Sequence, residues 1–268
     1  MLSSLAQHLR AGELALTIKV NLSDPQVCEI AALAGADAVW LDREHCVGDW
    51  PGLYHQILAA RRRDTEAIVR VPRGSYSDIV KPYELGASAV MVPQIADLND
   101  AAAVVAQAKF APVGERALDG GNSDGDFGRL AFGDYMERAE RDTLLILQLE
   151  SPAAVEQADR IAALAGVDVV FFGPGDFAQK AGIPGQFGHA DVLAAQEAVA
   201  DAARNNGIVA GTVLHPGTSV ESLVTQGFTL INVAADGGEL RKALSNRIAA
   251  ARHTAAPLLE LSQPVHNA

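Results

Sequence analysis

Two acidic residues, Glu150 and Asp176, each follow a run of apolar residues and could together bind a divalent cation. Glu150 ends the run LLILQLE, and Asp176 follows the run VVFF and a Gly-Pro-Gly turn. On consecutive parallel strands such carboxylates would lie side by side, and a buried carboxylate without a partner is costly. A site with oxygen ligands alone suits Mg²⁺ or Mn²⁺, with Co²⁺ as a further option. The alternative is that Glu150 is a solvent-exposed strand end and Gly-Pro-Gly-Asp an ordinary turn.

An arginine and a histidine add groups that stabilise charge and move protons. Arg70 interrupts the apolar run AIVRVP, and a buried guanidinium needs a charged partner or a ligand. It can form a structural salt bridge, for instance with Glu150, or stabilise an oxyanion beside the cation, and the two are compatible. His45 ends the sequence Asp-Arg-Glu-His after another apolar run, and an imidazole titrates near neutral pH, as a general base must. No lysine at a strand end offers a Schiff base, and Lys19, inside the first predicted strand, is the one candidate to check.

A repeated pattern predicts the elements that must position these residues. A glycine followed by an apolar run recurs four times, and four further apolar runs lie between these, which gives eight predicted strands. Because the runs lack polar alternation, the strands are expected to be buried on both faces. The stretches between them carry apolar residues at helical spacing. These predicted helices cover residues 25–34, 52–63, 78–85, 99–109, 153–164, 189–205, 219–226 and 240–253.

Eight strands that alternate with helices predict an α/β fold, a (β/α)8 TIM barrel that forms a single domain over residues 1–268. The competing fold is a doubly wound sheet, but its glycine-rich dinucleotide turn is absent after the first strand. In a TIM barrel the active site lies at the carboxyl ends of the strands. Glu150, Asp176, Arg70 and His45 all fall near such ends, which favours a catalytic interpretation.

Two segments depart from this alternation. About thirty residues, 112–142, separate the fourth predicted helix from the fifth predicted strand, and loops of that length are usually functional or disordered. This long loop is expected either to cover the rim of a neighbouring subunit's barrel or to be a mobile acidic surface loop. Residues 240–268 are expected to form a C-terminal helix and arm.

Composition argues against several classes of partner. A total of 21 Lys and Arg against 33 Asp and Glu gives a net charge of −12, which disfavours nucleic acid and anionic membranes. No apolar stretch approaches the ~18 residues of a membrane span, and the first residues lack the basic-then-apolar layout of a secretory signal. Two cysteines are too few for a disulfide framework. A cytoplasmic protein that acts on small molecules is therefore expected.

Five motifs, LDREH, VRVP, GASAVMVP, LQLE and FFGPGD, resemble in order and spacing those of the HpcH/HpaI aldolase/citrate lyase family. The resemblance spans about residues 10–250 and is greatest to the class II pyruvate aldolases of 4-hydroxy-2-oxo acids. It implies a metal-dependent retro-aldol cleavage that yields pyruvate, or a related 2-oxo acid, and an aldehyde. It also implies a homo-oligomer, typically a hexamer built from dimers that exchange their C-terminal helices.

The resemblance also assigns roles to individual residues. Glu150 and Asp176 match the family's metal ligands, and Arg70 matches its enolate-stabilising arginine. His45 matches the histidine that takes part in proton transfer. Glu84 falls where the family places an acid, usually Asp, that pairs with this histidine.

Four further positions match the family or depart from it. The backbone around Gly175 and Asp176 matches the site that holds the pyruvate carboxylate, and Gln148 lies within the metal-site strand motif. Arg43 stands where the family usually has a small residue, which adds a positive charge near the rim. Arg116 is followed by Ala where the family has Arg-Gly, so the binding of the aldehyde end is open.

Three alternative functions remain open at this stage. A metal-independent isomerase or lyase could bind a phosphorylated substrate at Gly211-Thr212 and at Asp236-Gly237-Gly238, the usual phosphate end of such barrels. A non-catalytic barrel could act as an oligomeric scaffold. A lyase of the same family could cleave a CoA thioester, although the sequence shows no evident basic patch for the CoA phosphates.

Overall fold

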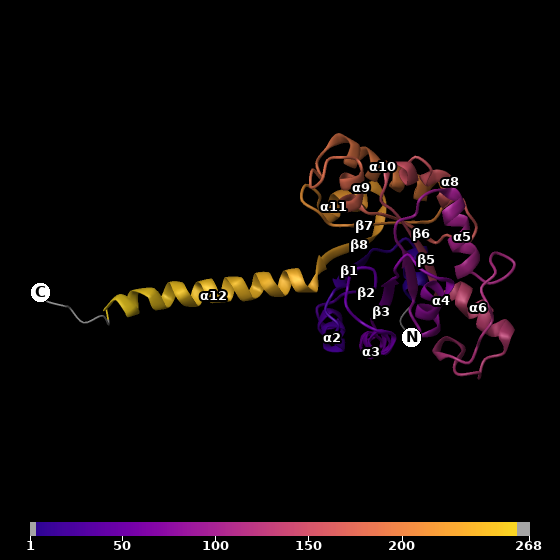
Figure 1. Cartoon of the computed structure of the whole chain (residues 1–268), viewed down its shortest axis with the longest axis horizontal. Helices are drawn as coiled ribbons and strands as arrows, with labels where there is room; N and C mark the ends of the chain where they lie inside the picture. Colours follow the sequence, from indigo (N-terminus) through magenta and orange to yellow (C-terminus); the bar gives the residue numbers. More distant parts are fainter. Residues whose placement is uncertain (1–3, 262–268) are drawn as a thin grey trace, which may run out of the picture.

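Eight parallel strands form a closed barrel in the order of the chain, which confirms the predicted TIM barrel (Figure 1). The computed structural model describes residues 4–261. The strands are β1 (Ala15–Val20), β2 (Ala38–Asp42), β3 (Glu66–Arg70), β4 (Ala89–Val92), β5 (Leu144–Leu149), β6 (Val169–Phe172), β7 (Val209–Val213) and β8 (Phe228–Ala235). β1 pairs with both β2 and β8, which closes the barrel.

Helices surround the barrel on the outside and extend it at the C-terminus. They are α1 (Leu5–Arg10), α2 (Pro25–Leu33), α3 (Trp50–Arg61), α4 (Tyr76–Glu84), α5 (Leu98–Ala108), α6 (Phe132–Asp142), α7 (Pro152–Val155), α8 (Ala158–Ala162), α9 (Pro174–Lys180), α10 (Ala190–Asn206), α11 (Val220–Gln226) and α12 (Asp236–Leu261), with a short 3-10 turn η1 (Ser123–Gly125). The repeated glycines follow or cap helices at positive φ, as the sequence predicts; for example, Gly35 has φ 94° and Gly227 has φ 106°.

The strands divide the core into two layers because their side chains alternate between the inside and the outside of the barrel. The inner layer includes Trp40 and Phe171, whose rings meet edge to face at 5.5 Å, and residues of α1 pack against the same cluster. The outer layer lies between the strands and the helices. Lys19, Asp42 and Arg70 follow the inward positions of their strands, so that polar groups lie at the carboxyl end of the barrel interior.

Besides the short N-terminal helix α1, two helices were not predicted from the sequence. The last part of the predicted 112–142 loop forms α6, which contacts α1 at the amino end of the barrel. Its many charged residues hide the helical pattern, because only Tyr135 is buried. The second is α9, which begins at Pro174, so Gly-Pro-Gly-Asp is the first turn of a helix and not an isolated turn. Proline at the first position and an acid in the first turn are both helix-start signals.

The C-terminal helix α12 projects away from the barrel as a single 26-residue helix (Figure 1). Every residue from 238 to 256 is exposed. Residues 262–268, which the sequence places in a C-terminal arm, lie outside the described residues. Between residues 4 and 261 no helix is both long enough and apolar enough to cross a membrane.

Candidate active site

The two predicted metal ligands, Glu150 and Asp176, lie together at the carboxyl end of the barrel, joined by Gln94. Glu150 directly follows β5, and Asp176 lies in the first turn of α9, which follows β6. The backbone N–H of Gln94 donates to Glu150 Oε1 at 2.7 Å, and its side-chain Nε2 donates to Asp176 Oδ2 at 3.4 Å. Lys180 Nζ donates to the side-chain oxygen of Gln94. The two carboxylates therefore face one space, lined on one side by Gln94.

Glu150 is an incompletely satisfied acid, although only 1% of the residue is exposed. Its Oε2 atom is buried without a hydrogen-bond partner among the residues that the structure describes, and so is Gln148 Oε1. Burial raises the pKa of Glu150 to about 8; the neighbouring Asp176 carboxylate acts in the same direction, against the hydrogen bond from Gln94. Next to these atoms, a Cβ at Gly173 would lie 2.7 Å from Glu150 Oε2. The orphaned oxygen, the second carboxylate and the space kept by a glycine fit a hard divalent cation.

Arg70 forms its salt bridges with Asp42 and Glu44, not with Glu150 as the structural alternative suggested. Its Nε and Nη2 donate to Asp42 at 3.0 and 2.6 Å, and Nη1 lies 3.0 Å from Glu44 Oε2. The reason lies in the sheet register, because Asp42 and Arg70 are direct partners of β2 and β3. Burial alone would raise the Asp42 pKa, but the hydrogen bonds from Arg70 and Lys19 outweigh it and hold this pKa well below its usual range.

The guanidinium of Arg70 is thus fixed before any ligand binds. Its central carbon lies 5.0 Å from the centre of the Trp40 ring, a cation–π contact. Its Nε and Nη2 each donate to Asp42, and Nη1 faces Glu44 Oε2, an oxygen that accepts no hydrogen bond from residues 4–261. N–H groups of Arg70 therefore remain for a ligand. Glu150 acts on it electrostatically and raises the Arg70 pKa, as do Asp42 and Glu44, against the effect of burial. Arg70 therefore lies near Glu150.

His45 lies in the loop after β2, where its side chain is 61% exposed. Its Nε2 lies 3.5 Å from Glu44 Oε2, the carboxylate that also contacts Arg70. Arg43, the unusual residue of this loop, does not point at the acids, because its guanidinium donates to the carbonyl of Gly48. Arg43 therefore links two positions of its own loop.

The structure does not bring Glu84 to His45 within one chain. Glu84 is the last residue of α4, a helix that runs from the carboxyl end of β3 to the amino end of β4, whereas His45 follows the carboxyl end of β2. Partial burial raises the Glu84 pKa, Arg116 lowers it and Asp124 raises it, so these two are its charged neighbours. A partnership between Glu84 and His45 would need a second copy of the chain.

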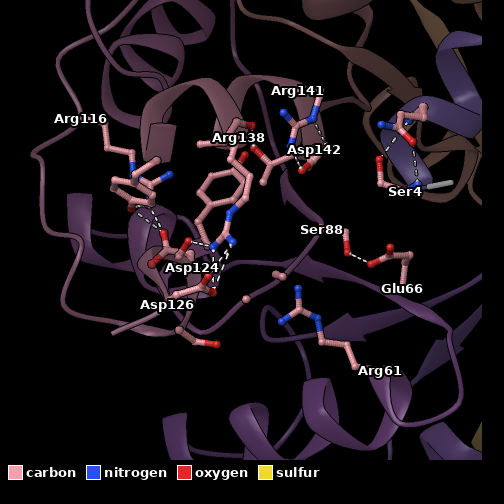
Figure 2. Close-up of a pocket in the computed structure, with 18 residues that line it drawn as sticks. Ser4, Arg61, Glu66, Ser88, Arg116, Asp124, Asp126, Arg138, Arg141 and Asp142 are labelled. Atoms are coloured by element: carbon pink, nitrogen blue, oxygen red, sulfur yellow. Dashed lines mark hydrogen bonds and ion pairs between the residues drawn. The ribbon is translucent and has the colours of Figure 1, made fainter. Parts of the chain in front are cut away.

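Arg116 and Asp124, these neighbours of Glu84, line a cavity of about 700 Å³ (Figure 2). Neither Glu150 nor Asp176 is among its lining residues. Ser88, just before β4, and Glu66, at the start of β3, line it, which places it at the amino end of the barrel. Two ion pairs, Arg116 with Asp124 and Arg138 with Asp126, form part of its wall. Half of the residues that line this cavity belong to the 112–142 segment, and none of them is a predicted metal ligand or His45 or Arg70.

The site at which the alternative function would bind a phosphate is occupied by the carboxylate of Asp236. Asp236 begins α12, and its carboxylate accepts hydrogen bonds from the backbone N–H groups of Asn21, Leu22 and Gly237. The second part of the expected phosphate site, at Gly211, packs closely against Phe171, since a Cβ on Gly211 would lie 2.5 Å from the Phe171 ring. The backbone donors that a phosphate needs are bound to a resident anion, which disfavours this alternative.

Sequence reasoning gave no role to Gln94 or Asp42 and considered Lys19 only as a candidate for a Schiff base, whereas all three lie at this end of the barrel. Gln94 follows β4, at the same end of the barrel as the others, and it has φ 55°, in the left-handed region. Lys19 lies 2.8 Å from Asp42 Oδ2, and an ion-paired ammonium lacks the free lone pair that a Schiff base requires. Their positions in the sequence could have identified these three residues, because each of them is polar and lies at or near a strand end.

Comparison with known proteins agrees with the fold and the motifs. A family model described as HpcH/HpaI aldolase/citrate lyase matches residues 17–243. A 2-keto-3-deoxy-L-rhamnonate aldolase of Salmonella dublin is 28% identical over 244 residues, which cover 91% of each protein. The crystal structure of an HpcH/HpaI aldolase from Desulfitobacterium hafniense has a TM-score of 0.86 at 26% identity, covering 99% of this chain and 100% of that one.

A third similarity is to a family protein of Burkholderia cenocepacia, with a TM-score of 0.85 at 30% identity and coverage of 92% of this chain and 98% of that one. The match of the family model extends over most of the chain, and the curated relative is similar over nearly its whole length. The chain therefore belongs to the HpcH/HpaI aldolase/citrate lyase family and is a carbon–carbon lyase with the metal-dependent aldolase chemistry of that family.

Proposed function

We propose that this enzyme cleaves, and in reverse forms, 4-hydroxy-2-oxo acids, with pyruvate or a related 2-oxo acid and an aldehyde as products. The observation that carries the proposal is the unpartnered Oε2 of Glu150 beside Asp176, with the fixed guanidinium of Arg70 nearby. The Salmonella relative supports this substrate class, because its name specifies a 2-keto-3-deoxy sugar acid.

Glu150 and Asp176 would hold the divalent cation, and Mg²⁺, Mn²⁺ and Co²⁺ are the candidates. When bound, such a cation polarises the keto and carboxylate oxygens of a 2-oxo acid. Two protein carboxylates leave the remaining coordination positions to water and substrate. The backbone around Gly175 and Asp176 and the side chain of Gln148 then orient the carboxylate end.

The bond cleavage depends on charge and proton handling by this chain's own residues. His45 removes the proton of the 4-hydroxyl group and the C3–C4 bond breaks as the aldehyde leaves. The electron pair of that bond forms the C2–C3 double bond, and the carbonyl pair moves to the C2 oxygen. The proton held by His45 then returns to C3 and gives pyruvate. N–H groups of Arg70 that do not bond Asp42 donate to the developing enolate oxygen. Because Asp42 and Trp40 already fix Arg70, little reorganisation is needed as the charge develops.

The exposed helix α12 supports a further part of the proposal, a homo-oligomer, which the family resemblance specifies as a hexamer. Leu240, Leu244 and Ile248 are spaced by four residues and are 50%, 53% and 51% exposed. On the barrel, Ile30 and Leu33 of α2 are 64% and 70% exposed. Apolar stripes of this kind on an isolated helix gain stability only by packing against another surface. Light scattering of the chain with and without residues 239–268 tests this, because only the full chain is expected to form the oligomer.

Activity and metal dependence can be tested together. Pyruvate released from 4-hydroxy-2-oxo acids is followed by a coupled lactate dehydrogenase assay, before and after EDTA treatment and after addition of each cation. EDTA should abolish cleavage and one of the cations should restore it. Glu150→Gln should weaken the restoring cation's affinity, whereas Glu156→Gln, which alters an exposed carboxylate nearby, should not. Cleavage that is indifferent to EDTA would contradict the proposal and favour a metal-independent enzyme.

A further inference from the structure

Gln94 is a neutral residue that contacts three charged side chains, and the mechanism above does not use it. Its side chain bridges Asp176, in the first turn of α9, and Lys180, the last residue of that helix. Nε2 donates to Asp176 Oδ2 at 3.4 Å, and Oε1 accepts from Lys180 Nζ. Its backbone N–H donates to Glu150 Oε1 at 2.7 Å. Gln94 therefore contacts both proposed metal ligands and a lysine.

Gln94 bonds one oxygen of each carboxylate and leaves the other oxygen without a hydrogen bond. Glu150 Oε2 is buried and has no partner within the described residues. Asp176 Oδ1 likewise accepts no hydrogen bond from residues 4–261. Carboxylates that bind metals are usually oriented by such a bond to their second oxygen. The two contacts of Gln94 therefore leave one oxygen of each acid for a cation.

The pairing of Lys180 is unusual for its position on α9. Asp176 and Lys180 are four residues apart on this helix, a spacing at which opposite charges normally pair. Within residues 4–261, however, Lys180 forms no ion pair, and its hydrogen bond goes to the neutral side-chain oxygen of Gln94. An ammonium bound to Asp176 would neutralise the carboxylate that a divalent cation requires. Gln94 keeps these two charges apart.

The backbone and the amide of Gln94 are both held in one orientation. Its φ of 55° lies in the left-handed region, which residues other than glycine seldom adopt. Residues held in such conformations cluster at functional sites. A reversed amide would direct its carbonyl at Asp176 and its N–H groups at the Lys180 ammonium, so the charges on both sides select the observed orientation. One residue thus directs two donors at two carboxylates.

We propose that Gln94 is the positioning residue of the cation site: it holds one oxygen of Glu150 and one of Asp176, and it keeps the Lys180 ammonium off Asp176. This rests on the proposed function, because it assumes that the two carboxylates bind a divalent cation. A neutral donor orients a carboxylate without cancelling its charge, whereas an ammonium competes with the cation for it. Loss of a residue that orients metal ligands typically lowers metal affinity by about 10–100-fold.

The experiment measures cation binding alone and needs no substrate. The electron paramagnetic resonance signal of free Mn²⁺ falls as the full chain binds the ion, which gives the Kd. Gln94→Met keeps the backbone N–H but removes the amide, and it should weaken Mn²⁺ binding ~10-fold or more. Adding Lys180→Met to this variant should recover about threefold or more of the lost affinity, because no ammonium is left to bind Asp176. Lys180→Met by itself should not weaken binding.

A purely structural role for Gln94 predicts the opposite result for the double variant. Removal of Lys180 would then take away one more contact and would recover no affinity. Gln94→Gly is the second variant, since glycine adopts the left-handed conformation readily and should preserve the fold if methionine does not. It should show the same loss, and the same recovery with Lys180→Met. Gln179→Met, the same substitution at an exposed position of α9, is the control and should bind Mn²⁺ like the wild type.

The outcomes separate this proposal from the cation site on which it rests. Wild-type affinity in both Gln94 variants, or a double variant that binds no better than Gln94→Met, would overturn the proposal and leave the cation site in place. If the wild type does not bind Mn²⁺, or if Glu150→Gln binds it equally well, the cation site fails and this proposal fails with it. Pyruvate release gives an independent measurement. The Mn²⁺ concentration for half-maximal cleavage should be lowest in the wild type, higher in the double variant and highest in Gln94→Met.

Discussion

The two sides of the barrel mouth differ in how completely their charges are paired. On the β1–β3 side, Asp42 accepts from both Arg70 and Lys19, and Glu44 contacts Arg70. On the β5–β6 side, Glu150 and Asp176 share only the hydrogen bonds of Gln94, and one Glu150 oxygen has no partner within the described residues. The first side is preorganised before ligand binds, whereas the second gains its missing partner only with a cation. Catalysis of this kind needs both, a fixed donor and an incomplete binding site.

The largest effect is expected on the paired side, from Asp42→Asn. This change leaves Arg70 and Lys19 without their shared carboxylate, and breaking a buried ion pair costs about 3–5 kcal/mol. Because the folded-state pKa of Asp42 is depressed, its contribution to stability is present above its ordinary pKa and lost as the pH falls through the folded value. Urea denaturation from pH 7 to pH 3 should show a shallower dependence on pH in the variant. An unchanged slope would show that Asp42 is not the group that is titrated.

Arg70→Ala tests whether this preorganised side serves catalysis. Removing a donor to a developing oxyanion typically lowers kcat by about 10²–10³-fold. A loss of that size is expected in the pyruvate-release assay, with the cation affinity changed much less, because Arg70 is not a ligand in the proposed site. Arg70→Lys is the matched control for charge, and it should recover only part of the rate because it cannot donate to Asp42 through two nitrogens. If Arg70→Ala cleaves the substrate at the wild-type rate, Arg70 does not stabilise the developing enolate.

The exposed His45 provides a contrast with the buried groups of both sides. His45→Ala should leave the free energy of unfolding within about 0.5 kcal/mol, since surface changes are usually of that size. It should slow proton transfer by ~10²-fold or more. The measurement is cleavage rate together with exchange of the pyruvate methyl protons in deuterated water by NMR. If cleavage slows but methyl exchange does not, His45 handles only the hydroxyl proton.

The same comparison shows how far the sequence could predict the molecule. The repeated glycine-and-apolar-run pattern predicts the barrel because each unit buries one strand and one helix locally. It also places Glu150 and Asp176 just after consecutive strands. The partner of Arg70 could not be predicted, because three acids lie at strand ends and only the β2–β3 register decides that Asp42 is opposite. Register depends on packing around the whole barrel, which a single sequence does not display.

Glu84 and the 112–142 segment illustrate a second limit. The resemblance pairs Glu84 with His45, but the end of α4 places it beside Arg116 in the same chain. Whether another copy brings the two together depends on assembly, which one chain does not contain. The charged helix α6 was missed for a related reason, since little of its surface is buried in this chain.

Gly173→Ala is the smallest change and the most specific test of the unpaired side. The new Cβ would lie 2.7 Å from Glu150 Oε2 and 2.9 Å from Gln148 Nε2, so Glu150 must move out of the position that the proposed cation needs. A loss of cation affinity of about 10-fold, the lower end for displaced ligand geometry, is expected in Mn²⁺ titrations. Gly188→Ala, where a Cβ meets nothing within 4 Å, is the control. Because the Arg70 and Asp42 contacts lie elsewhere, the acid dependence of stability should be the same in Gly173→Ala as in the wild type. If both the affinity and that dependence change, the two sides are coupled through the barrel and are not independent halves of the site.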